Sequence, residues 1–211
     1  MRRFGIAVAL LSLAACGGDD APPALFGGFT PLGGGALLVP AQSCTLGTNT
    51  VTLSAVAVGL TSYADACDVV AATEAYVCGD KASATIVFGI GIRMNAWNLP
   101  IADAGTGTWV VTSNPQADGN GTAELAVAVA NQSDAACASR PGSPLEATSG
   151  RVTLAAVSDV AATGDVSLGF ENGSRFAEPF DVPVCPASFD LCAALNGTTA
   201  CGGPYPTPCV P

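Results

Sequence analysis

The sequence of 211 residues contains no histidine. Serine and cysteine hydrolases use histidine as a general base, and most catalytic zinc sites use it as a ligand, so neither kind of site is expected. The sequence also lacks the GxSxG, P-loop and GxGxxG motifs of nucleophile elbows and nucleotide sites. We therefore expect no enzyme activity, no metal ion and no cofactor.

A hydrolase that uses two carboxylates needs no histidine and stays open as an alternative. The simpler interpretation of the candidate acids is that they lie on loops and on the helix surface, where water solvates them. The acids that such an enzyme could use are Asp65 with Asp68, Asp103, Asp118 with Glu124, and Glu171 with Glu178.

The apolar run at the N-terminus is short. Residues 4–11 follow Arg2 and Arg3 and are fewer than the about 20 apolar residues that a spanning helix needs. The run is followed by Leu13-Ala14-Ala15-Cys16. A basic start, a short apolar stretch and small residues before a cleavage point predict a secretory signal peptide over residues 1–15.

The cysteine directly after these small residues makes the segment similar to a bacterial lipobox. The resemblance implies that the chain is cut before Cys16 and that a diacylglycerol is attached to its sulfur. The residue after Cys16 is Gly17 and not an aspartate. This resembles the sequence of lipoproteins that are sorted to the outer membrane. We therefore expect a lipid-anchored protein of the bacterial cell envelope, on either face of the outer membrane.

Basic residues are few. Loss of the signal peptide leaves Lys81, Arg93, Arg140, Arg151 and Arg175 against 17 acidic residues, a net side-chain charge of −12. Such a surface repels nucleic acid and anionic head groups. We expect no nucleic-acid partner and a membrane attachment that depends on the lipid.

The cysteines support export. Eight remain after Cys16, and an even number in an exported chain predicts disulfides, here four. Zinc is disfavoured because histidine and paired CxxC motifs are both missing. Eight cysteines allow 105 pairings, so the sequence does not select one. The candidates are Cys44, Cys67, Cys78, Cys137, Cys185, Cys192, Cys201 and Cys209, with Cys192–Cys201 as a local loop.

Composition divides the mature chain into three parts. Residues 16–43 are rich in Gly and Pro and predict a lipidated tether, although the apolar residues among them could dock on the domain. Residues 44–185 are rich in Val and Thr, which favours β structure. Residues 186–211 form a Cys- and Pro-rich tail that disulfides would hold.

The β-rich part predicts an all-β sandwich or barrel of about 7–8 antiparallel strands with one helix. Helical spacing of apolar residues places the helix near residues 62–77, capped by Thr61 or Ser62. Asn172-Gly173 predicts a type I′ hairpin turn, and Pro179 and Pro183 predict an edge strand. The expected strands are 48–59, 84–93, 107–113, 122–131, 150–157, 164–170 and 175–184.

One candidate ligand patch follows the second strand. Arg93, Asn95, Trp97 and Asn98 could present a tryptophan ring and polar groups to a sugar. A packed tryptophan is the simpler interpretation, and Trp109, inside a strand, is expected in the core.

A faint calcium pattern precedes the fourth strand. Asp118, Asn120, Thr122 and Glu124 place oxygen atoms at alternate positions, but the full twelve-residue calcium loop is missing. A hairpin turn is therefore the favoured interpretation.

The C-terminal half resembles a family of uncharacterised β-rich bacterial lipoproteins. The matching runs are SGxVTL, GxVSLxF, NG and PFDVPVC between residues 149 and 185, and the likeness extends over about residues 50–185. The family has no assigned activity. In simpler members the cysteines that match Cys67 and Cys185 are often the only two besides the lipidated one, which implies a Cys67–Cys185 bridge.

Three functions are compatible with these features. The first is a non-enzymatic envelope protein whose domain binds a protein or glycan partner through its loops. The second is a structural coat component without a specific ligand, and the third is the carboxylate hydrolase. An exposed aromatic patch around Trp97 favours the first, and strand faces that are sealed all round, without a pocket, favour the second. Acids about 5–10 Å apart in a cleft would favour the third.

Overall fold

The computed structural model describes residues 23–46, 49–64, 66–71, 84–95, 105–111, 122–134 and 138–186. Within these ranges the chain is mostly β, as the sequence predicts. A single 3-10 turn precedes the first strand. In chain order the elements are η1 (Leu25–Gly27), β1 (Gly33–Leu46), β2 (Asn49–Thr61), α1 (Ala66–Ala71), β3 (Ala84–Asn95), β4 (Gly107–Val111), β5 (Thr122–Gln132), β6 (Leu145–Val157), β7 (Ala161–Phe170) and β8 (Arg175–Pro183).

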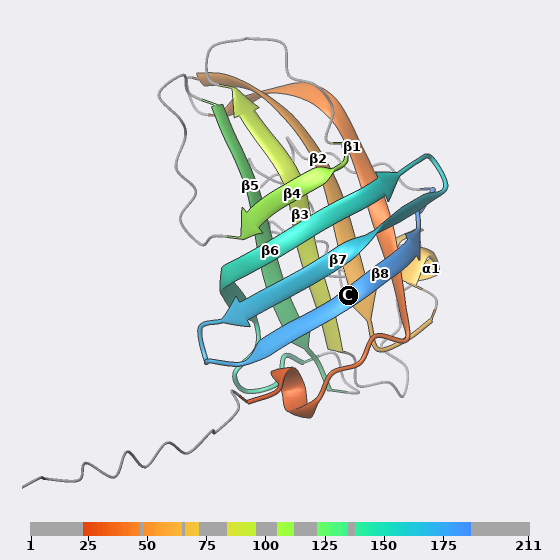
Figure 1. Ribbon diagram of the computed structural model, residues 1–211, viewed down its shortest axis with the longest axis vertical. Coiled ribbons are helices and arrows are strands. Elements are labelled where there is room, and N and C mark those ends of the chain that lie inside the picture. The colour runs from red at the N-terminus through yellow and green to blue at the C-terminus, as the bar shows by residue number, and fades with distance from the viewer. Residues whose placement is uncertain are drawn as a thin grey trace, which may run out of the picture.

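The strands form a two-layered sandwich. Their hydrogen-bonded order is β1-β2-β3-β5-β4-β6-β7-β8. Figure 1 shows β4, β6, β7 and β8 crossing in front of β1, β2, β3 and β5. Strand β6 joins the layers, because its first residues pair with β5 and its later residues pair with β4 and β7. The pairing is antiparallel except between β4 and β5, which are parallel at Val111 and Ala126.

The core lies between the two layers. In β4, β6, β7 and β8 buried and exposed residues largely alternate, which is the period of two that a strand imposes. Trp109 is 6% exposed and belongs to this core, as expected from its position within a strand. The largest fully buried side chains are Leu25, Ile86, Leu154, Val56, Val58, Val111, Val152 and Val166.

The domain begins earlier than the sequence predicts. Residues 33–43 belong to β1 and are not part of a tether, and Leu25 is only 1% exposed. The predicted boundary at residue 44 is therefore wrong, and the folded part extends back to residue 23. The prediction fails because a run of three glycines, Gly33 to Gly35, has the composition of a flexible linker.

The glycines are instead required by close packing. A Cβ atom on Gly35 would lie 2.5 Å from Cys185 Sγ and 3.1 Å from Cys67 Sγ. A Cβ atom on Gly34 would lie 2.6 Å from Val182 Cγ1. Only glycine allows the backbone of β1 to approach this closely.

This contact closes the sheet on itself. Strands β1 and β8 are the two ends of the strand order, and Ala36 of β1 forms a parallel bridge with Val184, the residue after β8. The Cys185 N–H donates to the Ala36 carbonyl oxygen at 2.8 Å. The disulfide Cys67–Cys185 then joins α1 to the end of β8 over the same glycines. The bridge that the family resemblance implies is thus confirmed.

Two local predictions need correction. The described part of the helix begins at Ala66, later than residue 62, because Thr61 is the last residue of β2 and its hydroxyl donates to the Tyr63 carbonyl oxygen at 2.6 Å. Residues 72–77 of the predicted helix lie outside the described ranges.

The β7–β8 hairpin is also not of type I′. Gly173 has a φ of 82°, whereas Asn172 does not have a positive φ. The Gly173 N–H donates to Phe170 O and the Phe170 N–H to Ser174 O. This is the type I turn with a glycine bulge that three-residue hairpins use. Strand β8 lies last in the strand order, as the two prolines predict, and its contact with β1 is made by the residues that follow Pro183.

We expect Gly35→Ala to destabilise the protein by about 1–3 kcal/mol, the usual cost of overpacking. The clash is with the two sulfur atoms, so the same substitution should cost almost nothing in a protein that also carries Cys67→Ala and Cys185→Ala. Urea unfolding of the four proteins measures both costs. An equal cost of Gly35→Ala in both backgrounds would show that the disulfide is not what requires glycine.

Candidate functional site

The structure describes only the backbone of two residues of the predicted ligand patch. Arg93 and Asn95 lie in the last part of β3, where their register partners in β5 are Glu124 and Thr122. Trp97 and Asn98 lie outside the described ranges. The sugar-binding patch therefore stays a prediction.

The candidate acids that are described lie on different elements. Asp68 lies on α1, Glu171 in the β7–β8 turn and Glu178 on β8, and the side chains of Glu171 and Glu178 are exposed. Glu124 lies in β5. Asp65, Asp103 and Asp118 are outside the described ranges, as is Asn120 of the calcium pattern. Among the described residues, no group of three or more His, Cys, Asp or Glu side chains could hold a metal ion.

Three of the cysteines are described. Cys67 is bonded to Cys185, and Cys44 is 2% exposed and is also in a disulfide. The other cysteines lie outside the described residues. They are Cys16, Cys78, Cys137, Cys209 and the predicted pair Cys192 and Cys201.

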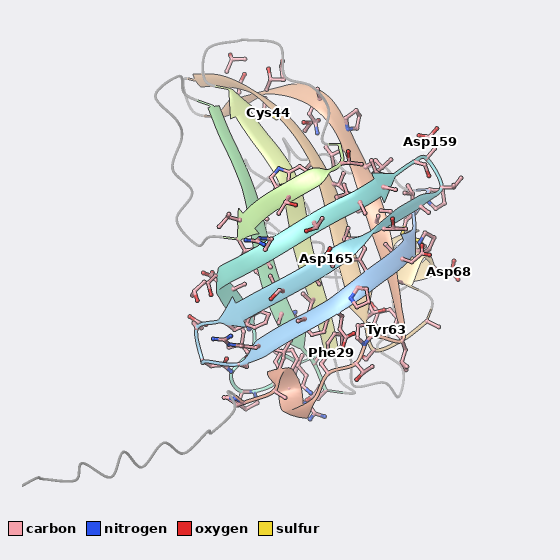
Figure 2. All side chains as sticks on the ribbon, in the orientation of Figure 1. Phe29, Cys44, Tyr63, Asp68, Asp159 and Asp165 are labelled. Carbon is pink, nitrogen blue, oxygen red and sulfur yellow. A yellow bond between two sulfur atoms is a disulfide. The ribbon has the colours of Figure 1, made fainter. Side chains whose placement is uncertain are left out.

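A groove that the sequence did not predict lies between β1, β2 and the turn from β6 to β7. Its volume is about 370 Å³. We call it the bulge groove. Asp159, labelled in Figure 2, marks its position in the upper right of that view. The residues that line it are Leu38, Val39, Pro40, Ala55, Val56, Val157, Ser158 and Asp159.

Irregular pairing surrounds the bulge groove on three strands. The register shifts between Val39 and Gln42 of β1, between Thr52 and Val56 of β2, and between Leu154 and Ala156 of β6. Bulges bend strands and interrupt the ladder, and they are common at barrel rims and beside sites. Pro40 fits here because a bulge does not need its missing N–H.

The walls of the bulge groove are mainly apolar. The Ser158 hydroxyl is committed to the turn, since it accepts from the backbone N–H groups of Val160 and Ala161 at 3.3 and 3.2 Å and donates to the Ala161 carbonyl oxygen at 3.3 Å. Asp159 is exposed, and no hydrogen bond or ion pair holds its carboxylate within the described part of the chain. The groove thus offers an apolar wall with one available negative charge.

An exposed apolar side chain stands next to the bulge groove. Val160 is 73% exposed and follows directly after Asp159. Its carbonyl oxygen accepts from the Val184 N–H at 2.9 Å, which fixes the turn against the end of β8. The rim of the groove is therefore held by backbone hydrogen bonds although its side chains face solvent.

The alternation pattern could not reveal this groove. It arises where the register slips, and a slip leaves little trace in a sequence of alternating apolar residues. The available signals were Pro40 after the run Leu37-Leu38-Val39, and a turn, Ser158-Asp159, that ends in an apolar residue.

Comparisons with protein families, curated proteins and solved structures give no match to this chain. The helices of the described residues include none that is long and apolar enough to cross a membrane.

Proposed function

We propose that the protein is a lipid-anchored component of the bacterial envelope whose β-sandwich is a non-enzymatic binding domain. The bulge groove is its binding site. The observation that carries the binding function is an apolar groove of about 370 Å³ with the available Asp159 carboxylate at its rim. Ligand sites are usually concave and apolar with a few polar groups.

The anchor is supported by the N-terminal sequence and by the disulfides. Cys16 follows small residues at the expected cleavage point. Cys67–Cys185 and the disulfide of Cys44 are bonds that persist in oxidising compartments outside the cytosol. Gly17 supports a location at the outer membrane. The C-terminal motifs support membership of the β-rich lipoprotein family.

The bulge groove favours a binding domain over a coat component. A coat protein without a ligand has no need of such a concavity. The groove also supports binding over catalysis, because its hydroxyl group, Ser158, is engaged by the turn. Charge complementarity selects the ligand chemistry, which is an apolar side chain next to a basic group that can pair with Asp159.

The lipid anchor predicts that Cys16→Ser moves the protein from the membrane fraction to the soluble fraction. The net charge of −12 gives the domain no electrostatic attraction to anionic lipid. Fractionation of envelopes, with immunodetection of both forms, measures the change. Continued pelleting of the Cys16→Ser protein with membranes would contradict the anchor.

The groove predicts that Asp159→Lys abolishes capture of the partner by cross-linking in intact envelopes. The variant reverses the charge at the rim and extends a long side chain beside the apolar wall. Asp165→Lys is the matched control, because it changes the net charge equally at an exposed position in the middle of β7, as Figure 2 shows. Equal capture by both variants would exclude the bulge groove, and absence of any specific capture would favour the coat function.

A further inference from the structure

The chain is attached to the domain from residue 23 onward. Ala24 bridges Arg175, and the Arg175 N–H donates to the Pro23 carbonyl oxygen at 3.3 Å. Leu25 is buried in the core, and the ring centroids of Phe29 and Phe176 lie 5.6 Å apart. A segment whose composition predicts part of a long tether therefore packs against the sandwich.

This attachment leaves a short connection to the lipidated residue. Seven steps along the chain separate Cys16 from Pro23. Fully extended they span at most about 25 Å, and a flexible coil of that length has a mean reach of roughly 15 Å. A lipid on Cys16 must therefore hold residue 23 within about 25 Å of the bilayer.

One end of the sandwich carries residue 23, and we call residues 25–32 the η1 end. In Figure 1 the chain enters at the bottom of the molecule, where η1 and the start of β1 lie. Leu32 is 72% exposed there, and Phe26 and Phe29 are partly buried. The apolar groups of this end are thus in part available to a neighbouring surface.

We propose that the η1 end rests on the lipid interface, with Leu32 inserted among the head groups and the bulge groove turned away from the bilayer. The proposal rests on the lipid anchor of the proposed function and adds the orientation of the domain. The partner is a lipid surface, because the short connection brings no other surface so close. Attraction is apolar, since the acidic domain is not drawn to anionic head groups.

The position of the groove agrees with this orientation. Asp159 lies towards the upper end of the molecule in Figure 2, and Phe29 lies near the bottom. An anchored domain that stands on its η1 end therefore presents the bulge groove and Val160 to the compartment. A partner could reach the groove without displacing lipid.

Tryptophan fluorescence with brominated phosphatidylcholine vesicles tests the orientation. The lipidated protein is reconstituted with Leu32→Trp or with Val160→Trp, and the signal of the parent protein, which contains Trp97 and Trp109, is subtracted. The two positions are matched, because Leu32 is 72% and Val160 73% exposed. We expect bromine to quench the added signal of the Leu32→Trp protein several-fold more than that of the Val160→Trp protein.

A longer connection provides a second test on the same vesicles. Inserting roughly 20 Gly and Ser residues after Gly18 increases the mean distance between Cys16 and residue 23. The η1 end is then no longer held close to the bilayer. The lengthened protein should still pellet, while quenching of its Leu32→Trp form decreases. Unchanged quenching would show that the short connection does not set the orientation.

The outcomes separate the orientation from the anchor. If the parent protein pellets and the Cys16→Ser protein does not, the anchor stands. Equal quenching at the two positions, or quenching at neither, would then overturn the orientation alone. If the parent protein failed to pellet, both the anchor and the orientation would be wrong.

Discussion

The contact between the glycine backbone of β1 and the Cys67–Cys185 disulfide is the constraint on which the rest of the structure depends. An open sheet exposes unpaired backbone groups at both edges. Here the two end strands meet, through the Ala36–Val184 bridge and the hydrogen bond from Cys185 N–H to Ala36. Few hydrogen bonds cross this junction, so the covalent bond and the absence of side chains at Gly34 and Gly35 have to maintain it.

Two functional features follow from the way the junction is made. Because β1 is needed for closure, the segment before it is drawn into the fold, and Leu25 and Phe29 cover the lower end of the core. The connection to Cys16 is then short. In the middle of β1 the ladder slips after Val39, and the bulge groove forms there. Strand β1 thus links the segment that follows Cys16 to the bulge groove.

The sequence predicts most of the sandwich and little of the candidate site. Strand β2 lies close to the predicted residues 48–59, whereas β6 begins at Leu145 and β7 at Ala161, before the predicted residues 150 and 164. Strand β1 escapes prediction because glycines that are required by close packing look the same in a sequence as glycines of a linker. The hydroxyl of Thr61 suits a helix cap. Because Thr61 is the last residue of β2, this hydroxyl donates to the Tyr63 carbonyl oxygen instead. The groove depends on register slips and on pairs of strands that are distant in sequence, which no local pattern encodes.

Native-state hydrogen exchange at the amide of residue 185 tests the closure of the sandwich most directly. This amide bonds to Ala36 across the junction, whereas the amides in the middle of β6 and β7 belong to ladders that the disulfide does not touch. Removal of the disulfide by Cys67→Ala with Cys185→Ala should accelerate exchange at residue 185 by about tenfold or more and leave the middle of β6 and β7 protected. Unchanged exchange at residue 185, or an equal increase in every strand, would contradict a junction that the disulfide holds closed.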